Sequence, residues 1–237
     1  MKIVAVIPVR YASTRFPGKP LADVCGKTMI ERVYEQAIQI AGIDRVIVAT
    51  DDERIVAAVN GFSGNSVMTS RECASGTDRV AQAVKDIDAD AVINVQGDQV
   101  ILDSGALTGL VECMADGEQM ATIAVPAKPE DLNDPNIVKV ACSIKGYALY
   151  FSRSIIPYER SSGHYKMLKH VGVYGYAKDT LFKIKQLPQS PLELSESLEQ
   201  LRALEYGIPI KVVTAEGEFH EINTEQDRER IIREWPL

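Results

Sequence analysis

Short apolar runs alternate with amphipathic segments through the first hundred residues. Runs rich in β-branched residues predict four buried strands, at 2–9, 44–52, 66–70 and 90–98. Apolar residues at helical spacing predict three helices between them, over 28–42, 52–62 and 76–88. Strands that alternate with helices of about 10 to 15 residues are typical of an α/β fold with a mostly parallel sheet flanked by helices.

The pattern changes after about residue 120. Three apolar segments with turn residues between them predict antiparallel strands, within 120–127, 136–153 and 169–178. A long amphipathic segment at 190–207 predicts one helix that Gly207 closes, and 208–216 predicts a further strand. No linker separates the two halves. We therefore expect a single α/β domain over 1–237, with an antiparallel portion at about 120–190.

Polar residues follow three of the predicted parallel strands. Arg10 comes after the first strand, Asp51 ends the second, and Asp98 ends the fourth. In open α/β sheets, ligands bind in the crevice beyond the carboxyl ends of the strands. The sequence therefore predicts one crevice at which these strand ends meet.

Composition narrows the class of protein. The 237 residues are 46% hydrophobic and 25% charged, with a formal net charge of -7, which argues against a protein that binds nucleic acid by neutralising its phosphates. No apolar run approaches the 18 residues of a membrane-spanning helix, so we expect a cytoplasmic protein without a membrane partner. The four cysteines are far apart and fit reduced thiols.

The loop after the first strand is basic. It contains Arg10, Arg15 and Lys19, with Ser13 and Thr14 between the two arginines and the turn formers Pro17, Gly18 and Pro20 around the lysine. Arginine forms bidentate contacts with phosphate, and lysine supplies a compact positive charge. The loop is either an anion-binding site or an exposed basic turn, and its own residues do not decide between the two.

Three further segments carry candidate chemistry, each with a structural alternative. Asp98 can bind Mg²⁺, which prefers oxygen ligands, or it can simply form a turn. Ser75–Arg79 can place an anion at a helix N-terminus, or it can be an ordinary helix cap. Glu196 and Gln200, four residues apart in the predicted helix 190–207, can contact a polyol or form a solvated face. His170, just before an apolar strand, can be a ligand contact or a core histidine.

Taken together, nine segments resemble the 3-deoxy-manno-octulosonate (Kdo) cytidylyltransferase family. The segments follow the family's order along nearly the whole chain: IPVRYASTRFPGKPL, VATDDERI, VMTS, SGTDR, NVQGD, NIVKV, ALYFSRSIIPYER, KHVGVYGY and LEQLRALEYG. The resemblance implies a nucleotide-diphospho-sugar-transferase-like fold, with an antiparallel portion that serves formation of a homodimer. It also implies a reaction in which CTP and a Kdo-type sugar acid, with Mg²⁺, give a CMP-sugar for lipopolysaccharide biosynthesis and pyrophosphate.

The resemblance also implies roles for individual residues. Arg10, Lys19 and Asp98 match the catalytic positions, and Asp98 and Asn223 match the metal positions. The positions that match nucleotide contacts are Arg10, Ser13, Thr14, Arg15, Lys19, Ser75, Gly76, Thr77 and Arg79. The positions that match the surroundings of the sugar are Gln96, Gln99, Arg160, His170, Tyr174, Glu196, Glu199 and Gln200.

Three positions depart from the family's usual pattern. Cys73 stands where the family usually has His, Gln99-Val100 stands for Glu-Pro, and Asn223 stands for an Asp that is a second metal ligand. The segments CASGTDR and GDQV look closer to a branch that activates 8-amino-3,8-dideoxy-manno-octulosonate. Activation of another acidic sugar of the sialic-acid type, or a regulator that binds nucleotide or sugar without turnover, stand as alternatives.

Overall fold

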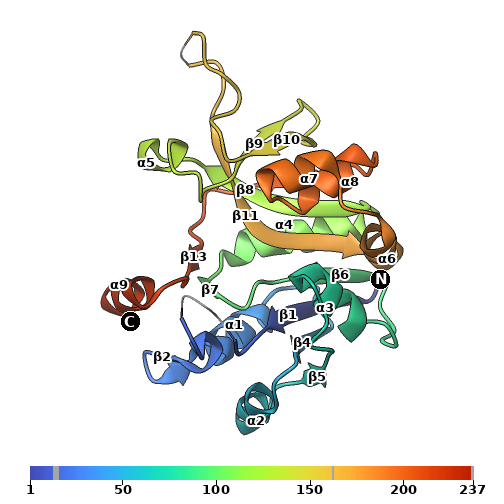
Figure 1. Ribbon diagram of the computed structural model, residues 1–237, viewed down its shortest axis with the longest axis vertical. Helices are drawn as coiled ribbons and strands as arrows, with labels where there is room; N and C mark the ends of the chain where they lie inside the picture. Colours follow the sequence, from blue (N-terminus) through green and yellow to red (C-terminus); the bar gives the residue numbers. More distant parts are fainter. Residues whose placement is uncertain (13–15, 162, 236–237) are drawn as a thin grey trace.

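The computed structural model describes residues 1–12, 16–161 and 163–235. Nine of the strands in these residues form one sheet, whose main path has the order β10-β9-β11-β6-β1-β4-β5, with β8 beside β11 and β12 beside β8 (Figure 1). The predicted α/β class is confirmed.

The first half of the chain builds the parallel part of the sheet. β1 (Ile3–Val9) lies between β4 (Arg45–Thr50) and β6 (Ala91–Asn94) and is parallel to both, and β5 (Ser66–Met68) continues the sheet beyond β4. Val9 pairs with Thr50, so the carboxyl ends of β1 and β4 are level. This register exposes the loops after these strands along one edge of the sheet.

Alternate residues of β1 enter two different cores, because successive side chains of a strand point to opposite faces. Ile7 and its alternates pack with α1 (Met29–Ala37), α2 (Glu53–Gly61) and α4 (Ser104–Ala115). Val6 and its alternate pack with α3 (Gly76–Ala83) and α6 (Lys178–Gln186). Helices therefore cover both faces of the sheet, as the sequence pattern predicts.

The second half of the chain extends the sheet with antiparallel strands. β11 (Leu168–Ala177) pairs antiparallel with β6, with β8 (Met120–Pro126) and with β9 (Lys139–Cys142). β10 (Ala148–Ser152) pairs antiparallel with β9, and β12 (Lys211–Thr214) is parallel to β8. The predicted antiparallel portion is confirmed. Between β10 and β11, the described residues 153–161 and 163–167 form a segment that projects beyond the body of the molecule (Figure 1).

The predicted single helix at 190–207 is wrong, because two short helices occupy this segment. α7 (Pro191–Glu196) ends at Ser197, whose φ of 52° is left-handed, and α8 (Gln200–Glu205) follows. The Arg153 guanidinium donates to Glu196 O at 2.8 Å, a carbonyl that a continuous helix would bond to the N–H of Gln200. Glu196 and Gln200 therefore do not share a helix face, as their spacing had suggested.

The chain also contains elements that the sequence pattern did not assign. They are η1 (Lys19–Leu21), β2 (Asp23–Val24), β3 (Lys27–Thr28), β7 (Gln99–Ile101), α5 (Pro129–Leu132), β13 (His220–Glu221) and α9 (Glu225–Glu234). β13 pairs with β7, and α9 buries Ile231 in the core that α1 shares, while Arg228 bonds to Asp23 O at 2.7 Å. The C-terminal region thus returns to the loop after β1.

The helices of the described ranges include none that is both long enough and apolar enough to cross a membrane.

Candidate active site

A cavity of about 320 Å³ lies at the carboxyl ends of β1 and β6, and we call it the strand-end cavity. Arg10, Lys19, Gln96 and Asp98, all singled out from the sequence, contribute to its lining. They come from the loop after β1 and from the turn after β6. The register of the parallel strands therefore brings together residues that are nearly ninety positions apart.

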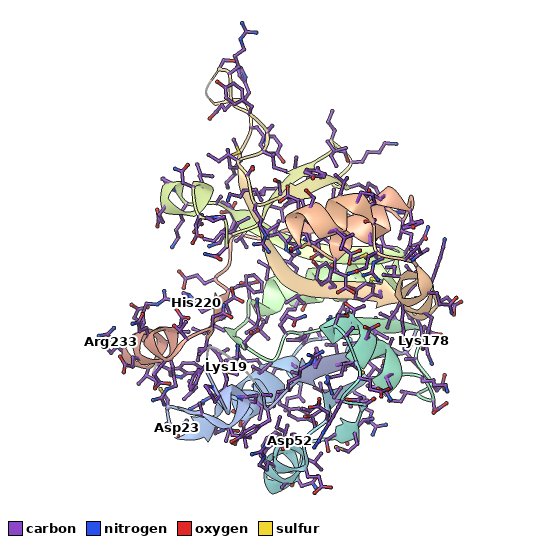
Figure 2. The ribbon with its side chains drawn as sticks, in the orientation of Figure 1. Lys19, Asp23, Asp52, Lys178, His220 and Arg233 are labelled. Carbon is purple, nitrogen blue, oxygen red and sulfur yellow. The ribbon has the colours of Figure 1, made fainter. Side chains whose placement is uncertain are left out.

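Lys19 and Asp98 form the charged centre of the strand-end cavity. Lys19 Nζ donates to Asp98 Oδ2 at 2.8 Å and to Ile222 O at 2.9 Å, so it also ties the segment after β13 to the cavity. Figure 2 labels Lys19 and His220 of β13 on the same side of the molecule. Gly97 lets the turn after β6 lie close to the end of β1, because a Cβ at this position would be 2.8 Å from Val9 Cγ2 and 3.1 Å from Pro8 O. The cavity thus holds an oriented ammonium beside a carboxylate.

Arg10 is exposed, and its Nη2 donates to the carbonyl oxygen of Cys73. This bond holds the loop before α3 against the strand-end cavity. Cys73 itself donates from Sγ to Gln82 Oε1 at 3.1 Å. Ser13, Thr14 and Arg15 lie outside the described residues, so their predicted phosphate contacts stay predictions.

The N-terminus of α3 is linked to the sugar-side residues of the prediction. Ser75 caps this helix, and the Ser75 and Thr77 hydroxyls donate to Glu199 at 3.3 Å and 2.9 Å. Burial raises the pKa of Glu199. Gly76 lies beside Gln96, since a Cβ on Gly76 would be 3.8 Å from Gln96 Oε1. The residues predicted to contact the nucleotide and those predicted to contact the sugar therefore meet at the start of α3.

Arg79 is buried away from the cavities, with 1% of its surface exposed. Its guanidinium donates to Asp51 Oδ2 at 2.8 Å and to Thr69 Oγ1 at 2.5 Å. These bonds join α3 to the ends of β4 and β5. Direct contact between Arg79 and a nucleotide would require this buried ion pair to open, so its geometry favours a structural role.

A second and larger cavity, of about 730 Å³, lies on the antiparallel side, and we call it the polar cavity. Gln99, His170 and Asn223, again singled out from the sequence, contribute to its lining. Its charged lining residues come from several elements: Lys128, Glu130, Asp131, Asp134, Lys169, Glu221, Asp227 and Arg230. Five of these eight side chains are acidic. The cavity is therefore built for a polar ligand.

Glu221 is a lining residue that the sequence did not indicate. It pairs across β13 and β7 with Gln99, which is 5% exposed and whose Oε1 has no hydrogen-bond partner within the described part of the chain. Glu221 is exposed at the surface of β13, and desolvation by the surrounding protein together with the charge of Asp98 raises its pKa, while a hydrogen bond from Asn223 and the charge of Lys19 oppose the shift. The only sequence signal is that residues 221 and 223 alternate, which places them on one face if the chain is extended.

His170 lies among aromatic rings at the edge of the polar cavity. Its ring is 5.1 Å from that of Phe151 and 5.3 Å from that of Tyr174, and its Nε2 is 3.0 Å from Thr122 Oγ1. Burial lowers the pKa of His170 to about 3, so the imidazole is neutral. Tyr174, Glu199 and Gln200 line a small cavity of about 30 Å³ together with Thr77.

Glu196 and Arg160 lie apart from these cavities. The Glu196 carboxylate accepts from Ser152 Oγ at 2.6 Å and from Arg153 N at 3.0 Å. Burial alone would raise the pKa of Glu196, but these hydrogen bonds lower it below its usual value. Arg160 is exposed on the projecting segment and is not a lining residue of the three cavities. Their predicted sugar contacts stay predictions.

Lys139 is a second residue that the sequence did not indicate. Its side chain is fully buried, and Nζ donates to Asp134 O, Ile137 O and Arg153 O, each at 2.8 Å. Burial lowers the pKa of Lys139. The first two carbonyls belong to the wall of the polar cavity, and the third begins the projecting segment. Lys139 therefore holds that wall in position.

The donor set near Asp98 suits a Mg²⁺ ion that arrives with its substrate. The described residues contain no group of three or more His, Cys, Asp or Glu side chains that could hold a metal ion alone. Mg²⁺ keeps several waters and binds through one or two carboxylates plus substrate phosphates. Asp98, with Glu221 and Asn223 nearby, fits that requirement, and no all-protein cage is needed.

The chain is similar to known proteins over nearly all of its length. A family model described as Cytidylyltransferase matches residues 4–214. The 3-deoxy-manno-octulosonate cytidylyltransferase of Syntrophotalea carbinolica is 45% identical, with 98% of this chain and 97% of that protein covered. The 8-amino-3,8-dideoxy-manno-octulosonate cytidylyltransferase of Shewanella pealeana is 47% identical, with 96% of each covered. A solved CMP:2-keto-3-deoxy-manno-octonic acid synthetase in complex with CTP superposes with a TM-score of 0.95, at 41% identity and 98% coverage of both chains.

Proposed function

The chain belongs to the cytidylyltransferase family, and on that premise we propose that it couples CTP to a sugar acid of the 3-deoxy-manno-octulosonate type. The products are a CMP-sugar and pyrophosphate, and the CMP-sugar serves lipopolysaccharide biosynthesis in the cytoplasm. The observation that carries the proposal is the contact of Lys19 with Asp98 in the strand-end cavity, beside Arg10 and Gln96. An oriented cation and a carboxylate at this edge of the sheet suit a triphosphate that brings a divalent metal ion.

In the proposed reaction, the anomeric hydroxyl oxygen of the sugar attacks the α-phosphorus of CTP. The new oxygen–phosphorus bond forms as the bond between the α-phosphorus and the bridging oxygen breaks, pyrophosphate carries away the electron pair, and the hydroxyl proton is released to solvent. Arg10 and Lys19 neutralise the phosphates and the charge that develops on the leaving group. Asp98 and Asn223 would hold Mg²⁺, which when bound neutralises phosphate charge and orients the reacting groups. Catalysis is therefore positioning and charge neutralisation, without a covalent enzyme intermediate.

The sugar acid occupies the polar cavity beside the strand-end cavity. Asp98 and Gln99 are successive residues that line one cavity each, so the two substrates meet at this pair. The neutral His170 and the amide of Gln99 offer hydrogen bonds to hydroxyl groups without adding charge. Lys128 supplies positive charge for a carboxylate on the same side, and Lys169, which lies 3.1 Å from Asp131, adds to it in part.

The antiparallel portion serves homodimer formation in this proposal. Its projecting segment exposes apolar side chains, with Tyr158 88% and Ile155 41% exposed, and Leu149 of β10 is 64% exposed. Exposed apolar groups gathered on one element suit burial against a second copy. Light scattering coupled to gel filtration should give twice the monomer mass for the parent chain. A Tyr158→Ser variant that stays monomeric would support the assignment, and a monomeric parent would contradict it.

The proposed reaction is tested by pyrophosphate release from CTP and Mg²⁺ with a panel of sugar acids. We expect release with 3-deoxy-manno-octulosonate, its 8-amino analogue or both, and a CMP-sugar of the corresponding mass by mass spectrometry. Release with a sialic-acid-type sugar alone would redirect the assignment. Tight CTP binding without release on any sugar would instead favour a regulator.

A further inference from the structure

The segment between β13 and α9 contacts both members of the Lys19–Asp98 pair. Ile222 N donates to Asp98 O at 2.9 Å, and Ile222 O accepts from Lys19 Nζ at 2.9 Å. The Ile222 side chain is fully buried, in the core that α1 shares. One buried residue of the C-terminal region therefore fixes the position of the Lys19 ammonium relative to the backbone of Asp98.

Arg228, in α9, holds the backbone end of Lys19. Its Nη1 donates to Asp23 O at 2.7 Å, and Asp23 begins β2, directly after the turn that contains Lys19. That turn is closed by a hydrogen bond from Ala22 N to Lys19 O at 3.1 Å, so its residues move together. The C-terminal region thus contacts the lysine at both ends, through Ile222 at the ammonium and through Arg228 at the main chain.

α9 is itself fixed to the body of the molecule. Ile231 is 2% exposed and packs in the same core as α1. At the end of the helix, the Trp235 ring lies 4.9 Å from Arg32 Cζ of α1, and Arg32 Nε donates to Val24 O at 3.0 Å. The short hairpin of β2 and β3 is therefore held by an arginine from α1 and by an arginine from α9.

We propose that Arg228 is a positioning residue for Lys19 in the strand-end cavity. The inference rests on the proposed function, in which the Lys19 ammonium neutralises the phosphates of CTP. A lysine ammonium is a point charge on a flexible four-carbon stem, so its position depends on what holds its two ends. A misplacement of about 1 Å can cost about 10²-fold in rate, even when its cause lies far from the reacting atoms. The C-terminal helix thereby serves catalysis without touching the substrate.

The experiment is a double-mutant cycle between Arg228→Gln and Lys19→Met, read as kcat/KM for CTP. We expect Arg228→Gln alone to lower kcat/KM by about tenfold, within the limit set by a 1 Å misplacement. Added to Lys19→Met, the same substitution should lower it by less than about twofold, because the group that Arg228 positions is absent. Arg228→Lys, which keeps a charged donor, should recover part of the loss. Arg233→Gln, at an exposed arginine of the same helix, should match the parent (Figure 2).

Calorimetric binding of a CTP analogue with a methylene group between its α- and β-phosphates, with Mg²⁺, repeats the cycle without turnover. A loss of affinity in Arg228→Gln that disappears in the Lys19→Met background supports the inference even if pyrophosphate is never released, in which case the proposed function alone fails. Equal losses in the two backgrounds overturn the inference, because Arg228 would then act on the fold and not through Lys19. So does affinity equal to that of the parent in Arg228→Gln.

Denaturant unfolding of every variant accompanies the cycle. Arg228→Met, which keeps most of the aliphatic stem, replaces Arg228→Gln in both backgrounds if that variant does not fold. The same two outcomes then decide: a loss that depends on Lys19 supports the positioning role, and a loss that is independent of Lys19 overturns it.

Discussion

The strand-end cavity and the polar cavity share a border but differ in how they are built. In the strand-end cavity, residues from two loops at the ends of parallel strands meet, and its central charges are already paired, with Lys19 Nζ 2.8 Å from Asp98 Oδ2. The polar cavity draws its lining from the antiparallel strands, from the segment around α5 and from the C-terminal region, and five of its eight charged lining residues are acidic. The strand-end cavity suits a ligand that is the same in every reaction, such as a triphosphate. The polar cavity suits a ligand that can differ, such as a sugar.

This difference shows that binding of the triphosphate and selection of the sugar can depend on separate parts of this fold. Parallel strands deliver their carboxyl ends to one edge regardless of what the loops carry, so the phosphate side depends on topology. The sugar side depends on which side chains distant segments bring to the polar cavity. Substitutions on the two sides should therefore change different kinetic constants, and the predictions below test that separation.

The largest effect is expected at the border, in Asp98→Asn. Loss of the carboxylate removes the charged group that we assign to the metal and leaves Lys19 without its negatively charged partner. We expect kcat to fall by about 10²- to 10³-fold for every sugar, as for the loss of one preorganised electrostatic group. Pyrophosphate release across a Mg²⁺ titration measures it, with Asp116→Asn, an exposed carboxylate at the end of α4, as the control. Unchanged turnover in Asp98→Asn would show that Asp98 does not hold the metal ion at the border of the two cavities.

Lys139→Met should act on the sugar side and on stability. It leaves two carbonyls of the polar cavity's wall, and the Arg153 carbonyl beside them, without their donor. We expect the free energy of unfolding to fall by about 3 kcal/mol, since each orphaned buried group costs about 1–3 kcal/mol and the wall relaxes in part. The KM for the sugar should rise with little change in the KM for CTP. Denaturant unfolding and steady-state kinetics measure both, and Lys166→Met, at an exposed ion pair, is the control. Equal changes in the KM for the sugar and the KM for CTP would contradict the assignment of the two substrates to separate cavities.

Lys19→Met should show the opposite kinetic pattern. The substitution removes a positive charge from the strand-end cavity and keeps most of the side-chain volume. We expect kcat/KM for CTP to fall by about 10- to 100-fold, the size of a charge-assisted hydrogen bond. The KM for the sugar should change less than twofold, about the limit of the kinetic measurement. A larger effect on the sugar than on CTP would contradict the assignment of phosphates to this cavity.

The effect that is smallest at neutral pH concerns the pH dependence of stability at His170. Burial lowers its pKa from 6.5 to about 3. Below pH 6.5, the unfolded chain therefore binds a proton at this histidine that the folded chain does not bind. The free energy of unfolding should therefore fall as the pH drops from 6.5 towards 3, by at most about 1.4 kcal/mol per pH unit from this group. Thermal unfolding across this range should show a shallower dependence in His170→Gln and an unchanged one in His164→Gln, at an exposed histidine. Identical profiles in all three proteins would contradict the buried neutral state.

The sequence predicts most of the fold and one side of the site. Alternating strands and helices determine the parallel sheet, and that topology is why Arg10 and Asp98 could be placed together in advance. Asp51, which the same reasoning placed at the crevice, does not line the strand-end cavity and instead pairs with Arg79. The break between α7 and α8 could not be predicted, because Arg153 captures the Glu196 carbonyl from 43 residues away. Glu221 and Lys139 were missed for a similar reason. A strand of two residues carries no pattern, and the role of a buried lysine depends on which carbonyls surround it.

The measurement that tests the account most directly is a crystal structure of the full chain with CTP and Mn²⁺, in which anomalous diffraction locates the metal ion. We predict an anomalous peak against the Asp98 carboxylate, with the triphosphate in the strand-end cavity beside Arg10 and Lys19 and the polar cavity left for the sugar. A metal peak remote from Asp98, or a triphosphate in the polar cavity with the Lys19–Asp98 contact intact, would contradict the division between the two cavities.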